Sequence, residues 1–138
     1  INTFDFPTIN EDYRGKHYCY TYGMSAFALS RTALVKKNVC NSKDDKVWYQ
    51  ENHYVGEAHF LARPGGTSED DGVLITIVFD GTKEQSYLLL IDAKSMVPIG
   101  KSYLPHHIPW SAHGMHFPEA KLTMDVVDSR NNGIKVEL

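Results

Sequence analysis

The sequence predicts an all-β chain assembled from blade-sized units of a β-propeller, and three observations lead to this prediction. Apolar residues recur at a period close to two along most of the 138 residues, as in strands. Clusters rich in Gly, Pro, Asn and Asp separate the apolar runs at short intervals. No segment shows the 3.6-residue period of a helix of three turns.

The first predicted unit covers residues 16–50. Tyr18, Tyr20 and Tyr22 alternate along its first strand and so place three aromatic rings on one face. A polar segment at 41–45 lies between two apolar runs, which is the pattern of a hairpin.

The second predicted unit covers residues 57–103 and holds about four short strands joined by tight turns. Its strongest strand, 73–79, is a continuous apolar run that we expect to be buried on both faces. The acidic stretch 69–71 lacks the spaced oxygen ligands of a calcium loop. We interpret it as part of a turn whose Asp side chains cap backbone amides.

Two blade-sized units are too few to close a propeller, and a blade needs neighbours to cover both faces of its sheet. We therefore expect a piece of a longer chain, which agrees with a first residue, Ile1, that is not Met. The tail 119–138 alternates again around a turn signal at Asn131-Asn132-Gly133. A hairpin and a loosely ordered terminus both fit this tail.

The composition is that of a globular protein, with 42% hydrophobic and 22% charged residues. A net charge of −3 gives no basic surface for nucleic acid, so no nucleic-acid partner is expected. No secretory leader is recognised, and we expect a cytoplasmic location. Cys19 and Cys40 are then expected to be free thiols.

Four of the seven histidines fall within eleven residues: His106, His107, His113 and His116. Imidazole is the commonest metal ligand in proteins. However, the segment lacks the spacing of known zinc motifs and has no cysteine nearby. We therefore do not expect a metal site made from this segment alone. Hydrolase elbows, phosphate-binding glycine loops and dinucleotide fingerprints are also missing from the sequence.

Several segments together match a known pattern in order and spacing: FDFPTIN at 4–10, YTYG at 20–23, YVGE at 54–57, EDDGVL at 69–74, YLLLIDAK at 87–94 and IPWSAHG at 108–114. The combination spans residues 4–118 and resembles the carotenoid cleavage oxygenases. It looks closer to the animal branch, with the β-carotene oxygenases and the retinoid isomerohydrolase, than to the plant branch.

The resemblance implies a seven-bladed propeller with one Fe(II) ion on its axis, held by four histidines from different blades. Residues 1–118 would be the C-terminal part of that single domain, with 104–118 as the metal-ligand segment. By motif match, His113 before Gly114 would be a ligand of the iron. The other three ligands would lie upstream of this chain, so the piece alone is expected to be inactive.

The resemblance also assigns supporting roles to a few residues. Asp5 would orient one of the metal histidines, where the family usually has Glu; a strand-end cap is the alternative. Trp110 and Ala112 would line the substrate tunnel, with core packing as the alternative. Ala58 follows Glu57 where the family has Pro, a loss that we expect to loosen a turn.

The implied activity is cleavage of a carotenoid or apocarotenoid double bond by O2, which yields aldehyde or ketone products. A carotenoid or retinoid substrate and O2 are the expected partners, and peripheral membrane contact through other parts of the protein stays open. Three alternatives remain: a retinoid isomerohydrolase of the same fold, a non-catalytic carotenoid- or retinoid-binding propeller, and an unrelated propeller interaction module.

Overall fold

The computed structural model describes the chain except for residues 1–2, 29–30, 111–112, 116–122, 129–130 and 138. Its described part holds ten strands in three antiparallel sheets and two short 3-10 turns, and no α-helix. The all-β prediction is therefore confirmed. Within the same part of the chain, no helix is long and apolar enough to cross a membrane.

The first sheet has four strands in sequence order, each antiparallel to the next. They are β1 (Thr3–Thr8), β2 (Tyr20–Ala28), β3 (Arg31–Asn38) and β4 (Lys46–Trp48). Strand β1 precedes the unit predicted at 16–50. The 3-10 turn η1 (Glu11–Tyr13) follows β1, and η2 (Ser42–Asp44) connects β3 to β4.

The second sheet repeats this four-stranded arrangement in sequence order. Its strands are β5 (His53–Ala62), β6 (Gly72–Asp80), β7 (Gln85–Asp92) and β8 (Pro98–Tyr103). Burial alternates along β6, where Leu74 and Val78 are buried while Ile75 and Ile77 are half-exposed. The prediction of burial on both faces is wrong, because one face of β6 opens onto a cavity instead of packed side chains.

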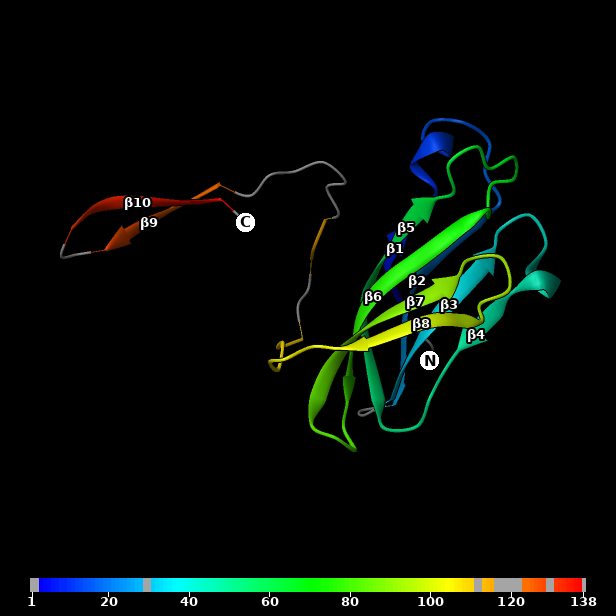
Figure 1. Cartoon of the computed structure of the whole chain (residues 1–138). Coiled ribbons are helices and arrows are strands. Elements are labelled where there is room, and N and C mark those ends of the chain that lie inside the picture. Colours follow the sequence, from blue (N-terminus) through cyan, green and yellow to red (C-terminus); the bar gives the residue numbers. More distant parts are fainter. Residues whose placement is uncertain (1–2, 29–30, 111–112, 116–122, 129–130, 138) are drawn as a thin grey trace.

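The hydrophobic core lies between the two sheets, which face each other in Figure 1. The Tyr22 and Phe60 rings stack across this interface with their centroids 5.4 Å apart. The core side chains come from both sheets: Tyr22, Met24, Leu34, Trp48, Val55, Ala58, Phe60, Leu74, Val78, Tyr87, Leu89, Ile91, Ala93 and Met96.

A buried ion pair also joins the sheets. Lys36 Nζ of β3 lies 2.7 Å from Asp70 Oδ2 in the turn before β6, and the two side chains are 2% and 8% exposed. The Lys36 ammonium also lies 4.0 Å from the centre of the Tyr20 ring. Burial by itself would raise the pKa of the Asp70 carboxyl, but the hydrogen bond and charge of Lys36 outweigh it and lower this pKa.

Glu69 makes a second connection from the same turn. Its carboxylate accepts hydrogen bonds from the backbone N–H groups of Cys19 and Tyr20, at 2.8 and 2.5 Å. The sequence had suggested that Asp side chains cap amides within this turn. Instead Glu69 caps amides at the start of β2, and Asp70 forms the ion pair. Both acidic residues therefore serve contacts between the sheets.

Cys19 and Cys40 form a disulfide with Cα atoms 5.2 Å apart, so the prediction of two free thiols is wrong. Tyr20 pairs with Asn38 at the end of the β2–β3 ladder, and Val39 N donates to Cys19 O at 2.8 Å. This register brings the residues beyond the ladder together. Two cysteines 21 positions apart do not reveal such a register in the sequence.

The tail forms a hairpin of β9 (Thr123–Asp128) and β10 (Asn131–Glu137), paired antiparallel with each other. Of the two alternatives left by the sequence, the structure therefore has the hairpin.

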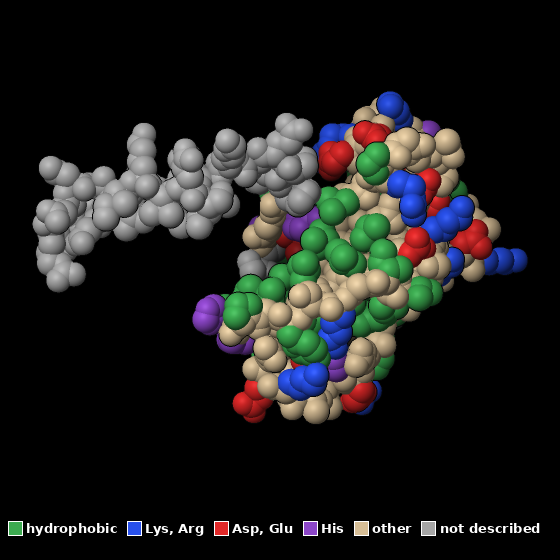
Figure 2. Space-filling model, viewed as in Figure 1, with side chains coloured by type: hydrophobic (Ala, Val, Ile, Leu, Met, Phe, Trp, Pro, Cys, Tyr) green, Lys and Arg blue, Asp and Glu red, His purple; other side chains and the backbone are tan. Residues whose placement is uncertain are grey.

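Apolar side chains remain exposed near β8. Figure 2 shows hydrophobic side chains gathered over the second sheet, and Val97 and Ile99 are 55% and 59% exposed. Contiguous apolar surface of this kind is typical of a face that packs against another element. It agrees with the expectation that blade-sized sheets need neighbours.

Replacing Asp70 tests the ion pair between the sheets. We expect Asp70→Ala to lower the free energy of unfolding by about 3 kcal/mol or more, because it leaves the Lys36 charge buried without its partner. Urea unfolding followed by the fluorescence of buried Trp48 measures this change. Asp71→Ala is the matched control, since it removes only an exposed contact with Arg63, worth about 1 kcal/mol or less.

The same pair predicts an acid dependence. Folding lowers the pKa of the Asp70 carboxyl below its ordinary value of 3.8. The carboxylate therefore stabilises the fold above about pH 3.8, and this contribution is lost as the pH falls through the folded-state pKa. Asp70→Ala should therefore lose less stability than the parent chain between neutral and acidic pH. Equal losses in both chains would contradict the role given to this ion pair.

Candidate functional site

The site begins at a β-bulge in β5. The register between β5 and β6 shifts between Val55 and Ala58, and both of these residues are buried against the core. The extra residue therefore leaves Glu57 and His59 on the opposite, half-exposed face. Glu57 and Ala58 lie inside a strand, so the interpretation of this pair as a loosened turn is wrong.

The Glu57 carboxylate lies beside the segment that carries His113. Its Oε1 atom is 3.5 Å from His113 Nδ1, and its Oε2 atom accepts a hydrogen bond of 2.9 Å from the backbone N–H of Gly114. Oε2 also lies 3.9 Å from His59 Nε2. Hydrogen bonds to a carboxylate are stronger than those between neutral groups. Glu57 therefore fixes both the ring and the backbone of this segment.

This geometry suits His113 as a metal ligand. A carboxylate next to Nδ1 favours the tautomer with its proton on Nδ1, which gives Nε2 the lone pair that binds a metal. The His113 side chain is 79% exposed, whereas that of Glu57 is 18% exposed. His113 is thus an imidazole with a defined orientation at an accessible position.

The segment before His113 is anchored to the start of β7. Ser86 is fully buried, and its hydroxyl donates to Ile108 O and accepts from Ile108 N, both at 3.1 Å. The Gln85 side-chain amide donates to Leu104 O at 2.9 Å. These contacts hold a stretch without regular secondary structure against the sheet.

Phe6 connects Asp5 to this site. The Phe6 ring meets the rings of Trp110 and His113 edge-on, at centroid distances of 5.9 and 5.5 Å. Phe6 has a positive φ of 51°, unusual for a bulky residue, and its N–H donates to Asp5 Oδ1 at 2.9 Å. The exposed Asp5 thus caps the backbone that places Phe6 against His113.

An apolar cavity of about 650 Å³ lies next to His113, a size typical of ligand pockets. The half-exposed face of the second sheet contributes Ile75, Ile77, Phe79 and Leu88 to its wall. Trp110, predicted to line the substrate tunnel, lines this cavity. Ala112, predicted beside it, lies outside the described residues.

The remaining histidines of the cluster are spread out. His107 lines the cavity, with its ring 5.1 Å from that of Phe79, and His106 is exposed. His116 lies outside the described residues. In the part of the chain that the structure describes, one group of three His, Cys, Asp or Glu side chains is close enough to share an ion, and it lies elsewhere, at His17, Cys19 and Cys40.

Comparison with known proteins identifies the family. A sequence profile of the family described as RPE65, retinal pigment epithelial membrane protein, matches residues 2–118. The chain belongs to this family. The predicted resemblance to the carotenoid oxygenases is thereby confirmed.

Curated relatives of this RPE65-family chain include fungal and animal proteins. It is 37% identical over 120 residues to a carotenoid dioxygenase of Neurospora crassa, and this alignment covers 85% of this chain and 19% of the relative. It is 34% identical over 116 residues to the human mitochondrial carotenoid-cleaving dioxygenase, and this alignment covers 83% of this chain and 20% of the relative. The chain thus spans about a fifth of the length of these relatives.

Solved structures show the same relationship. The chain matches cobalt-substituted Synechocystis apocarotenoid oxygenase (ACO) with a TM-score of 0.73 and 28% identity, over 83% of this chain and 25% of that one. It matches an ACO/RPE65 chimera with a TM-score of 0.72 and 25% identity, over 81% and 25% of the two chains. The propeller fold class is confirmed, with this RPE65-family chain matching a quarter of the seven-bladed structure.

Sequence reasoning missed Glu57 and Phe6 as parts of the site. The signal for Glu57 was present, because it ends the YVGE segment and oriented metal histidines need a carboxylate. Only the bulge in β5, however, shows that its side chain faces His113. Phe6 gave no signal in the sequence, since its contacts depend on its positive φ.

Removing the Glu57 carboxylate tests this arrangement. In Glu57→Ala we expect the Gly114 amide to exchange its hydrogen about tenfold faster or more, because a hydrogen bond to a charged group contributes about 1.5–3 kcal/mol. Amide exchange followed by NMR measures this. Glu84→Ala, at an exposed turn position, is the control and should leave the Gly114 amide unchanged.

Proposed function

We propose that this chain is part of an iron(II)-dependent carotenoid oxygenase and that His113 is one of the ligands of its iron. The observation that carries the proposal is the Glu57 carboxylate, 3.5 Å from His113 Nδ1 and hydrogen-bonded to Gly114 N. Metal-bound histidines generally have such a partner on the ring nitrogen that does not bind the metal. Relatives named carotenoid dioxygenase support the reaction class.

The cavity supports an apolar substrate such as a carotenoid. Aliphatic and aromatic side chains form most of its wall, and Glu57, His59, His107 and His113 add polar groups along it. Transfer of a long polyene from water to such a surface is favourable, by about 25 cal/mol for each Å² of apolar area that is buried. Trp110 would then contact the polyene near His113.

The metal and the residues around it have separate roles in the proposed reaction. Iron(II), when bound, supplies the activation of O2 for cleavage of the double bond. Glu57 orients the His113 ring and keeps the proton on Nδ1. The apolar wall of the cavity excludes water and holds the substrate beside the metal ligand.

Asp5 is proposed to help orient one of the metal histidines. Its carboxylate is one methylene shorter than the usual Glu, and Oδ1 accepts the Phe6 N–H. Its other oxygen, Oδ2, would hold a metal histidine, directly or through a water. Through the Phe6 N–H, Asp5 also supports the backbone that places the Phe6 ring against His113.

Metal analysis of the complete protein tests the ligand assignment. We expect His113→Ala to abolish bound iron, because the site loses one of its few protein ligands. His106→Ala, an exposed histidine of the same segment, should keep the iron of the parent protein. A near-full iron content in His113→Ala would contradict the proposal.

Activity measurements test Asp5. We expect Asp5→Ala to lower carotenoid turnover by about 10–100-fold, as for other residues that orient metal histidines. Asp5→Glu should restore turnover, because it returns the longer carboxylate. Unchanged turnover in Asp5→Ala would return this residue to a structural role at the end of a strand.

A further inference from the structure

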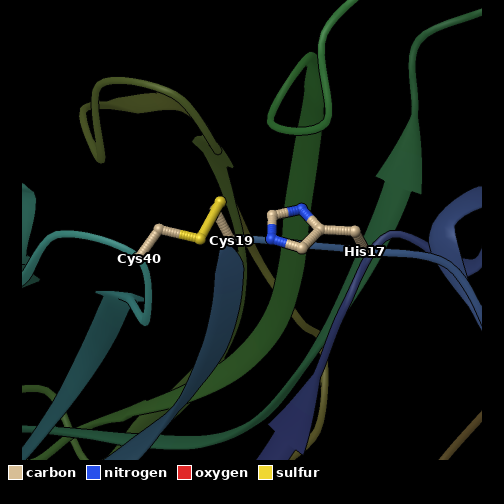
Figure 3. A group of neighbouring side chains, drawn as sticks. All are labelled: His17, Cys19 and Cys40. Atoms are coloured by element: carbon tan, nitrogen blue, oxygen red, sulfur yellow. A yellow bond between two sulfur atoms is a disulfide. The ribbon is translucent and has the colours of Figure 1, made fainter.

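The strongest unassigned feature of the chain is the group of His17, Cys19 and Cys40, shown in Figure 3. One ligand atom from each of the three side chains lies within 4.8 Å of the others. His17 and Cys40 are exposed and Cys19 is half-buried, so water and small ions reach the group. It is separate from the site at Glu57 and His113, with which it shares no residue.

The three ligands come together for local reasons. His17 and Cys19 lie two positions apart in the segment that leads into β2, and residues at this spacing in extended chain face the same side. Cys40 follows β3, whose pairing with β2 sets Tyr20 opposite Asn38. The ladder thus places Cys40 beside the other two.

Besides the disulfide, hydrogen bonds hold both cysteines in place. Glu69 accepts from Cys19 N, and Val39 N donates to Cys19 O at 2.8 Å. The Asn38 side chain, itself buried, accepts from Cys40 N at 3.0 Å and from Asn41 N at 2.9 Å. The backbone of the group is therefore fixed even when the two sulfur atoms are not bonded.

We propose that His17, Cys19 and Cys40 form a redox-gated zinc site, closed by the disulfide and opened by reduction. A dithiol supplies two electrons and two protons, the Cys19–Cys40 bond breaks to two thiols, and the dithiol becomes a cyclic disulfide. Zn²⁺ then binds both cysteines as thiolates and releases their two protons. The neutral His17 ring is the third ligand, and water takes the fourth position.

The geometry requires only side-chain movement. Zinc binds thiolate at about 2.3 Å in a tetrahedral arrangement, which needs the two sulfur atoms to stand about 3.8 Å apart. In the disulfide the two sulfur atoms are bonded to each other, so they must separate after reduction. Rotation about the Cα–Cβ bonds achieves this while the hydrogen-bonded backbone stays in place.

The donor set selects the metal. Two thiolates and one imidazole favour zinc or copper(I), whereas an oxygenase iron held by imidazoles alone uses no sulfur. The two sites therefore differ in the metal that they prefer. Zinc and the disulfide also exclude each other, because a sulfur atom bonded to sulfur is no thiolate. Either one links the start of β2 to the end of β3.

A comparison of the oxidised and reduced chain tests the proposal without any substitution. The 138-residue chain is reduced with dithiothreitol, freed of it under nitrogen, and titrated with Co²⁺ as an optical probe for zinc. We expect a thiolate-to-cobalt charge-transfer band in the reduced chain, absent from the oxidised chain and removed by added Zn²⁺. Cobalt spectra without this band in the reduced chain, or the same band in both, would overturn the proposal.

Calorimetric titration with Zn²⁺ then assigns the ligands. His17→Ala should weaken zinc binding to the reduced chain about tenfold or more, since even the loss of a residue that only orients a metal ligand has an effect of this size. His106→Ala, another exposed histidine, should bind zinc as the parent does. Circular dichroism of each sample monitors folding. Equal zinc affinity in folded His17→Ala and the parent would overturn the role of His17.

Discussion

The contact on which the structure depends is the buried ion pair between Lys36 and Asp70, which joins the two sheets at 2.7 Å. A charged lysine is rarely fully buried unless it is paired, so this contact requires the two sheets to keep their relative placement. The adjacent Glu69 adds hydrogen bonds from the same turn to the start of β2. Because β5 leads into that turn, its position relative to the first sheet follows.

The site follows from the placement of β5. Its bulge directs Glu57 away from the core, and Ser86 anchors the irregular segment that carries His113. The Phe6 ring, from the first sheet, completes the surroundings of the imidazole. A single histidine on a segment without regular structure thus acquires a defined orientation from three separate strands. This is the kind of support that a metal ligand requires.

The sequence predicted the all-β class well because strands are encoded locally, by the alternation of apolar residues. It also singled out His113, through its place in a motif. Long-range register was beyond it: the Cys19–Cys40 disulfide, the Lys36–Asp70 pair and the contact of Glu57 with His113 all join residues far apart in the chain. Such pairs depend on strand pairing and on the bulge, neither of which leaves a local pattern.

We propose that the His113 ring binds iron through Nε2, the nitrogen opposite the Glu57 carboxylate. Anomalous diffraction at the iron absorption edge, from a crystal of the complete protein, tests it most directly. We expect an iron peak at bonding distance from His113 Nε2, with Glu57 on the Nδ1 side of the ring. An iron peak remote from this ring, with His113 facing solvent, would contradict it.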